Sequence, residues 1–201
     1  MVQQPNRDGE ISLEQNFHPD HKTLLEAQIR ECYGRVVYSH KTHEKCADIL
    51  LKRNNHIKVW QLVLSAITTG SFLATILGNG NIAAIVGTVI STILLILNAY
   101  TKDFELVSVA EEHRNAANNI WIIREDYLSL ITDLKDMSPD ELIKRRDFLQ
   151  KELSEVYKGS PRTNFKAYEQ ARDALKNNEE LTFSEDEIDL LLPKQLRKFR
   201  E

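Results

Sequence analysis

The chain of 201 residues is 28% charged and 42% hydrophobic, and it carries a formal net charge of −4. Its mean hydropathy of −0.39 is that of a polar protein. The negative net charge argues against direct nucleic-acid binding through bulk electrostatic attraction. The two cysteines, Cys32 and Cys46, would lie roughly 21 Å apart on one helix, too far for a disulfide, and we expect reduced thiols.

The first 22 residues are polar and show no sustained hydrophobic period. We expect residues 1–22 to be disordered. They contain no apolar segment of the kind found in secretory signal peptides. The first apolar run of the chain is therefore expected to serve as its own membrane-insertion signal.

Residues 23–58 are predicted to form an amphipathic cytoplasmic helix. They contain no proline, and their apolar residues recur at spacings of four and three, which places them on one helical face. These residues are Leu25, Ile29, Cys32 and Val36.

Residues 59–100 are the segment around which the chain is organised, because residues 59–101 contain no charged side chain. Two apolar runs, 59–77 and 82–100, are separated by the turn sequence Gly78-Asn79-Gly80-Asn81. Each run would span roughly 28 Å as a helix, close to the thickness of a bilayer's hydrocarbon core. A hairpin buried in a soluble core is the alternative, but neither run has the charged face that a soluble helix normally shows. The sequence predicts a transmembrane hairpin.

The distribution of basic residues predicts the orientation of this hairpin. Lys52, Arg53 and Lys58 precede the first run, Lys102 follows the second, and the turn has neither lysine nor arginine. Because basic flanks stay in the cytoplasm, we expect both termini to be cytoplasmic and the turn to lie outside.

Residues 101–135 continue the helical pattern of the second run. No proline or glycine lies between Gly87 and Pro139, so the sequence predicts one continuous helix from residue 82 to about residue 134, roughly 80 Å long. We expect the apolar stripe of this segment to pack against residues 23–58, which the hairpin makes its antiparallel neighbour. The stripe comprises Phe104, Val107, Ala110, Ala117, Ile120, Ile123, Tyr127, Leu130, Ile131 and Leu134.

Residues 136–201 are predicted to form a C-terminal helical region. Ser138, Pro139 and Glu141 have the order of an N-cap, an N1 proline and an N3 glutamate, and Ser184 begins a second capping box. No segment predicts a strand, so the expected fold class is all-α. Between the two caps, a shorter helix is predicted to present one face formed by Phe165, Tyr168, Ala171 and Leu175.

Two clusters of ionisable residues lack the pattern of a catalytic or metal site. His40, His43, Glu44 and Cys46 lack the His-Glu-x-x-His spacing of a metalloprotease, and we interpret them as a solvated helix surface. We interpret Glu-Glu-His-Arg at residues 111–114 as surface charge. The sequence has no phosphate-binding glycine loop, nucleophile elbow or Cys-x-x-Cys motif. We therefore expect no enzyme activity, cofactor or metal ion.

Small residues recur every fourth position in both apolar runs. In lipid, such residues let two helix backbones approach closely, and we expect Gly70 and Gly87 to mediate helix contacts. The small residues are Ala66, Gly70 and Ala74 in the first run, and Ala83, Gly87 and Ser91 in the second.

The first run also carries a polar stripe on the face opposite its small residues. It comprises Gln61, Ser65, Thr68 and Thr75, with Phe72 among them. In one interpretation the hydroxyls bond to the carbonyl four residues earlier and face lipid at little cost. In the other, several hairpins assemble, the stripe lines a water-filled path, and Phe72 forms an apolar constriction. Two helices alone cannot enclose a pore, so the second interpretation requires a homo-oligomer.

The order of these elements resembles the SLATT family of bacterial two-transmembrane effectors. The shared features are a polar N-terminal helix, a tight hairpin with a Gly/Asn turn, a long helix after the second run and a helical tail. The segment Gly-Ser-Pro-Arg-Thr-Asn-Phe-Lys-Ala-Tyr at residues 159–168 is similar to the family's late Pro-plus-aromatic helix start. The resemblance covers about residues 23–192 and depends on architecture more than on an invariant motif.

The resemblance implies a non-enzymatic effector of a bacterial defence or conflict system, located in the bacterial inner membrane. It implies that the protein forms a pore or disrupts the bilayer when a nucleotide signal, or a partner protein that produces or senses one, triggers it. The alternative is a membrane-anchored helical scaffold that offers its helices to partner proteins.

Overall fold

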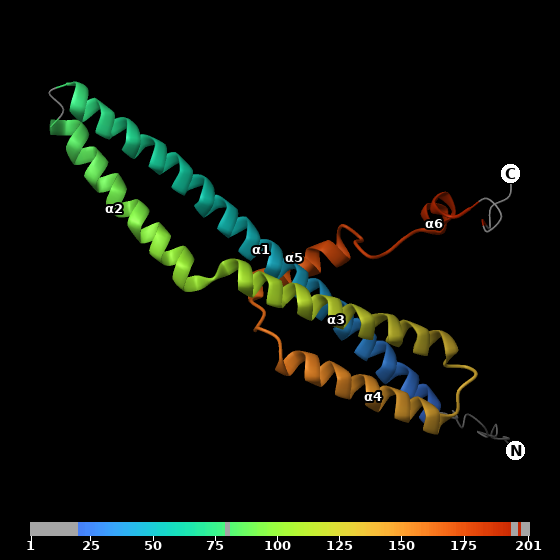
Figure 1. The fold of residues 1–201 in the computed structure, drawn as a ribbon. Coiled ribbons are helices and arrows are strands. Elements are labelled where there is room, and N and C mark those ends of the chain that lie inside the picture. Colours follow the sequence, from blue (N-terminus) through green and yellow to red (C-terminus); the bar gives the residue numbers. More distant parts are fainter. Residues whose placement is uncertain (1–19, 79–80, 194–196, 198–201) are drawn as a thin grey trace, which may run out of the picture.

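The computed structural model describes residues 20–78, 81–193 and 197, and every regular element among them is a helix (Figure 1). The expected all-α fold class is confirmed. The prediction of a disordered N-terminus falls mainly on residues 1–19, which lie outside the described residues, but its last two residues, His21 and Lys22, belong to α1. The helices are α1 (His21–Leu77), α2 (Asn81–Phe104), α3 (Leu106–Asp133), α4 (Pro139–Lys158), α5 (Phe165–Lys176) and α6 (Glu185–Leu191).

The longest helix, α1, joins the two halves of the molecule (Figure 1). Its 57 residues contain no proline, and they extend over roughly 86 Å as one helix. Residues 21–58 pack with α3, α4 and α5, and we call this part the bundle. Residues 59–77 pack with α2, and we call residues 59–77 and 81–100 the hairpin. A single rigid element therefore connects the bundle to the hairpin.

The second long helix is divided at Glu105, which corrects the prediction of one continuous helix from residue 82. Glu105 has φ 38° and ψ 45°, a left-handed conformation that costs a non-glycine residue on the order of 1 kcal/mol. The change of direction between α2 and α3 is visible in Figure 1. Leu106, the next residue, is buried. The break turns the apolar face of α3 onto α1, and this packing offsets the cost of the unfavourable backbone.

The bundle has one hydrophobic core, formed where α1, α3 and α4 meet. The predicted α1 face of Leu25, Ile29, Cys32 and Val36 is buried, and most of the predicted α3 stripe is buried too. Phe104 and Val107 are exceptions, because they flank the break and are exposed. The core comprises Ile29, Cys32, Val36, Ile120, Ile123, Tyr127, Leu130, Leu134, Leu142 and Leu149.

The predicted helix starts in the C-terminal region are confirmed. The Ser138 side chain accepts a hydrogen bond from the Glu141 backbone N–H, and the Glu141 carboxylate accepts one from the Ser138 backbone N–H at 2.9 Å. Ser184 and Glu187 form the same reciprocal pair at the start of α6. These caps satisfy backbone donors that have no partner inside the helix.

The buried face of α5 agrees with the predicted one only at Ala171 and, partly, at Leu175. Ala167, Ala171 and Ala174 are buried, whereas Phe165 and Tyr168 are largely exposed. Small side chains let α5 lie close against α1, where the Asn164 amide reaches the Cys46 sulfur at 3.7 Å. Alanine side chains therefore form the closest contact of α5 with α1, while the half-exposed Tyr168 ring lies 6.0 Å from the Tyr38 ring of α1.

Candidate functional site

The hairpin is closed along its length, with α1 and α2 side by side (Figure 1). Each helix presents to the other a row of partly buried residues at spacings of three and four. The row on α1 is Gln61, Leu64, Thr68, Ser71 and Thr75, and the row on α2 is Ala83, Gly87, Ile90, Leu94 and Leu97.

The outward faces of the hairpin are apolar and exposed. Both helices are long and apolar enough to cross a membrane, and no residue in the most apolar window of either is buried inside the protein. Leu62, Ile82 and Leu95, for example, are largely exposed. A helix in a soluble core would bury such side chains, so these faces fit a lipid environment.

Polar contacts hold the end of the hairpin nearest the bundle. The Gln61 amide donates a hydrogen bond to the Asn98 side-chain oxygen at 2.9 Å and one to the Thr101 hydroxyl at 3.4 Å. The Arg53 guanidinium lies over the Tyr100 ring, 5.1 Å from its centre. An interhelical hydrogen bond in a membrane contributes about 1 kcal/mol, so these contacts favour the closed hairpin.

The small residues of the two helices have different surroundings. A Cβ atom added at Gly87 would lie 3.2 Å from the Cβ of Ser71, so Gly87 allows α1 and α2 to approach closely. Ala83 belongs to the same contact row. On α1, Ala66, Gly70 and Ala74 are exposed. A Cβ added at Gly70 would have no described atom within 4 Å beyond its chain neighbours and the backbone of its own helix. The α1 row of small residues therefore faces away from α2.

A groove of about 360 Å³ opens on one side of the hairpin. Of the predicted stripe, Thr68, Phe72 and Thr75 line this groove, while Gln61 lies at the helix contact and Ser65 is exposed elsewhere. The structure thus brings only part of the stripe together. The lining residues are Thr68, Ser71, Phe72, Thr75, Ala83, Ala84, Gly87, Thr88 and Ser91.

The threonine hydroxyls of the groove donate to their own helix. Thr68 donates to the Leu64 carbonyl at 2.8 Å, Thr75 to the Ser71 carbonyl at 2.9 Å, and Thr88 to the Ala84 carbonyl at 2.8 Å. This bonding makes hydroxyls tolerable in lipid. Each hydroxyl oxygen keeps acceptor capacity that water can use, so these hydrogen bonds are compatible with both interpretations of the stripe.

The interpretation of the histidine cluster as a solvated surface is wrong. His40, His43 and Cys46 are buried, because they face α3 and α5. His113, interpreted as part of a charged surface, is buried as well. The Nδ1 atoms of His43 and His113 lie 3.0 Å apart, so one ring donates a hydrogen bond and the other accepts it. Burial lowers the pKa of both rings, to about 4 for His43.

The sequence holds a signal for this pair that the interpretation missed. His113 falls between Ala110 and Ala117 at spacings of three and four, which is the period of the buried α3 stripe. His43 continues the α1 face in the same way. No group of three or more His, Cys, Asp or Glu side chains suited to a metal ion occurs among the described residues. The pair is therefore a buried polar contact that joins α1 to α3.

An ionic contact attaches the segment after α5 to α1. The Lys41 ammonium, on a largely buried side chain, lies 2.6 Å from a Glu180 oxygen and 2.8 Å from a Glu44 oxygen. Burial lowers the pKa of Lys41, but the hydrogen bonds to Glu180 and Glu44 outweigh it and raise that pKa overall. The two carboxylates thus keep a buried ammonium charged and hold the chain beyond α5 against the bundle.

Comparison with known proteins agrees with this architecture. No curated protein and no protein of solved structure matches the chain. The model of the SMODS and SLOG-associating 2TM effector domain family 4 matches residues 25–187. This match extends from the second turn of α1, through the hairpin and the bundle, into α6. The chain therefore belongs to this family of two-transmembrane effector domains.

Proposed function

We propose that this membrane effector acts in a bacterial defence system by assembling several hairpins, which form a pore or disrupt the bilayer. A nucleotide signal, or a partner protein that produces or senses one, triggers the change. The proposal assigns no catalysed reaction to the chain. Family membership supports the effector role, and the groove beside Phe72 supports conduction as its mechanism.

The observation that carries the proposal is that one hairpin has both a groove lined by hydroxyl groups and, on α1, a row of small residues that faces away from α2. The groove is open on one side, so copies arranged around an axis would each contribute a polar wall. Gly70 has open space around it, so a neighbouring helix can approach α1 closely there. The hairpin thus offers one face to line a path and another to contact the next copy.

Phe72 is the residue to change first, because 66% of its surface is exposed and its ring lines the groove between hydroxyl groups. A bulky apolar ring closes a narrow pore by excluding water. We expect Phe72→Ser to raise dye release from proteoliposomes without any trigger, on the order of tenfold. Thr68→Leu, which removes a polar wall group, is expected to suppress conductance.

Leu73→Ser is the matched control, because Leu73 is also exposed on α1 but does not line the groove. It introduces the same polar group at the neighbouring position. The conduction proposal fails if Phe72→Ser and Leu73→Ser release dye equally, or if both the Phe72 and Thr68 variants behave like the parent at equal membrane abundance.

The orientation of the hairpin is a separate prediction. With the bundle in the cytoplasm of a bacterium, a cysteine at Asn81 should react with an impermeant thiol reagent added to intact cells, and a cysteine at Lys135 should not. Cys32 and Cys46 are buried free thiols, and a variant with both replaced by alanine controls for them. Labelling at Lys135 without labelling at Asn81 would place the bundle outside.

A membrane-anchored scaffold is the second candidate, favoured by an apolar surface on α3. Trp121, Ile122 and Leu128 are exposed there, on the bundle rather than on the hairpin. Such a surface suits a partner protein. Expression in a bacterium separates the candidates: depolarisation and dye entry support the effector, whereas harmless accumulation in the membrane supports the scaffold.

A further inference from the structure

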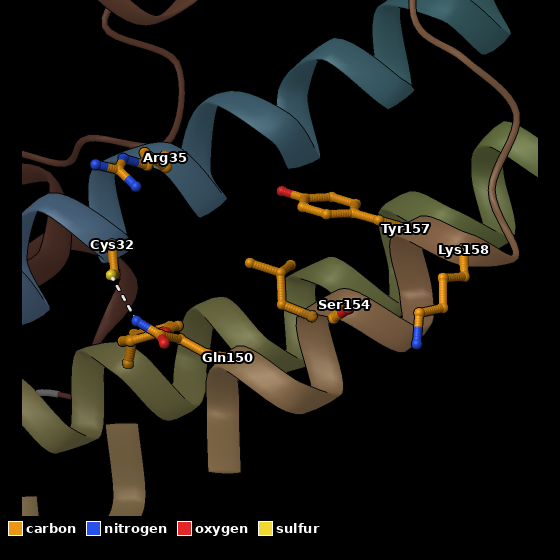
Figure 2. Close-up of a pocket in the computed structure, with 8 residues that line it drawn as sticks. Cys32, Arg35, Gln150, Ser154, Tyr157 and Lys158 are labelled. Atoms are coloured by element: carbon orange, nitrogen blue, oxygen red, sulfur yellow. Dashed lines mark hydrogen bonds between the residues drawn. The ribbon is translucent and has the colours of Figure 1, made fainter. Parts of the chain in front are cut away.

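The bundle contains a cavity of about 540 Å³ that is separate from the hairpin groove (Figure 2). Three helices line it: α1 provides Cys32 and Arg35, α3 provides Tyr127, and α4 provides the remaining side chains. Its volume lies within the range of small-molecule sites. The α4 residues are Gln150, Leu153, Ser154, Tyr157 and Lys158.

Tyr127 forms the floor of this cavity and leaves a polar group unsatisfied. The residue has no exposed surface, and its hydroxyl makes no hydrogen bond of normal geometry among the described residues, although burial and the nearby Cys32 thiol both raise its pKa. The nearby Cys32 thiol, a weak acceptor, already receives a hydrogen bond from the Gln150 amide at 3.6 Å, as the dashed line in Figure 2 marks. A buried hydroxyl without a partner is uncommon and destabilising, so the floor of the cavity has capacity for one more hydrogen bond.

The cavity favours a negatively charged occupant. No carboxylate occurs among the described residues that line it, whereas Arg35 stands at its edge on α1. Arg35 pairs with Glu31 on the same helix, but both side chains are largely exposed, and such a surface pair is weak enough to yield to a ligand. Lys158 pairs with Glu155 at 2.7 Å, and its side chain points away from α1 in Figure 2. Arg35 is therefore the cation positioned to meet an anion.

The cavity also has a flat apolar wall. The Tyr157 ring extends from α4 towards α1 across the opening (Figure 2), and 43% of the residue surface remains exposed. Leu153 lies one turn earlier on the same helix and lines the same wall. A planar ring can stack against an exposed tyrosine face while its edge reaches polar groups deeper in the site.

We propose that this cavity binds a small organic anion built on a planar ring, with the anionic group at Arg35, the ring against Tyr157 and a polar ring atom at the Tyr127 hydroxyl. An aromatic carboxylate and a mononucleotide share this chemistry. The proposal concerns ligand binding by the bundle and does not depend on whether the hairpin conducts.

Isothermal titration calorimetry on the full chain in lipid nanodiscs tests this site. The probes are indole-3-acetate and adenosine monophosphate, and the references are adenosine, which lacks the anion, and inorganic phosphate, which lacks the ring. We expect at least one probe to bind with a dissociation constant below about 1 mM and both references to bind more weakly. The tighter probe identifies the anion as carboxylate or phosphate.

Two variants locate the binding. Arg35→Gln should weaken it on the order of tenfold or more, whereas Arg30→Gln should not. Arg30 is the matched control, because it is exposed on α1 and paired with Glu26, but it does not line the cavity. Tyr127→Phe should weaken binding severalfold, yet raise the melting temperature of the ligand-free protein by roughly 2–4 °C, because it removes an unsatisfied hydroxyl.

Three outcomes would overturn the proposal. The first is that neither probe binds more tightly than the references. The second is an equal loss of affinity in Arg30→Gln and Arg35→Gln, which would indicate a bulk charge effect. The third is a lower melting temperature for ligand-free Tyr127→Phe, which would mean that the hydroxyl is already paired and not available to a ligand.

Discussion

Gly87→Leu is expected to separate the two helices of the hairpin, whereas Gly70→Leu is expected to leave the hairpin closed. A Cβ at Gly87 already approaches the Ser71 Cβ to 3.2 Å, while the space around Gly70 is open within the chain. The added branched carbons at Gly87 must push α2 away from α1, at a cost of about 1–3 kcal/mol by analogy with overpacked cores. Gly87→Ala should show a smaller effect in the same direction.

Cross-linking measures this difference directly. Gln61 and Asn98 meet across the hairpin at the ends of their side chains, 2.9 Å apart, so Gln61→Cys with Asn98→Cys should be joined readily by a short bifunctional thiol reagent, which spans more than a disulfide can. We expect the yield to fall severalfold when Gly87→Leu is added and to stay unchanged when Gly70→Leu is added. An unchanged yield in both would mean that Gly87 does not set the helix spacing.

The same variants probe assembly. If the row of small residues containing Gly70 contacts a neighbouring copy, Gly70→Leu should reduce cross-linked oligomers while the hairpin itself stays closed. Oligomers that are unchanged in Gly70→Leu would remove this row from the proposed interface. Because the hairpin and the oligomer are measured separately, a failure of one prediction leaves the other intact.

The bundle is expected to lose stability as the pH falls from about 6.5 to about 4. Burial, with smaller contributions from His113 and His40, lowers the pKa of His43 from 6.5 to about 4. The unfolded chain therefore binds a proton in this interval that the folded chain does not. The stabilising contribution is complete above pH 6.5 and declines as the pH falls, by on the order of 3 kcal/mol in total.

The neighbouring histidines act in the same interval and with the same sign, because the pKa of each is lowered in the fold. Burial lowers the pKa of His113, and Glu112 opposes this shift. Burial also lowers the pKa of His40, which Glu44 opposes and Arg124 reinforces. Hydrogen exchange of α1 and α3 amides at pH 7.5, 5.5 and 4.5 should show the loss of protection in the bundle.

Histidine variants identify the source of this pH dependence. His113→Leu alone should destabilise the bundle at neutral pH by about 1–3 kcal/mol, because it leaves the buried His43 nitrogen without a partner. His43→Leu combined with His113→Leu should recover much of that loss and flatten the pH profile. His56→Gln, a change at an exposed residue of α1, is the control. A double variant with the parent's pH profile would exclude the pair as its source.

Patterns in the sequence were sufficient to predict the hairpin, two helix caps and the buried face of α1, because each depends on residues that are close together in the chain. The absence of charge over residues 59–101 identified the hairpin, because burying charge in lipid is costly in any fold. The caps at Ser138 and Ser184 were readable because a capping box satisfies donors within four residues. The α1 face from Leu25 to Val36 followed from helical periodicity, which needs no knowledge of the partner helix.

Tertiary packing decided which side chains contact each other and where the second long helix breaks, and helical periodicity alone could not predict either. Whether a histidine three or four residues from an apolar neighbour is buried depends on the helix opposite. His43 and His113 can be buried at the contact of α1 with α3 because each ring is the other's hydrogen-bond partner. Glu105 adopts its left-handed conformation because α3 gains contact with α1, a benefit that local propensity does not contain. Both Gly70 and Gly87 suit close helix contacts, but only the spatial relation of α1 to α2 placed Gly87 inside the hairpin and left Gly70 facing outward. The sequence by itself determined which segments are helical, apart from the break at Glu105, and which are apolar enough to enter lipid. Side-chain partners are set by long-range contacts and were decided only in the folded structure.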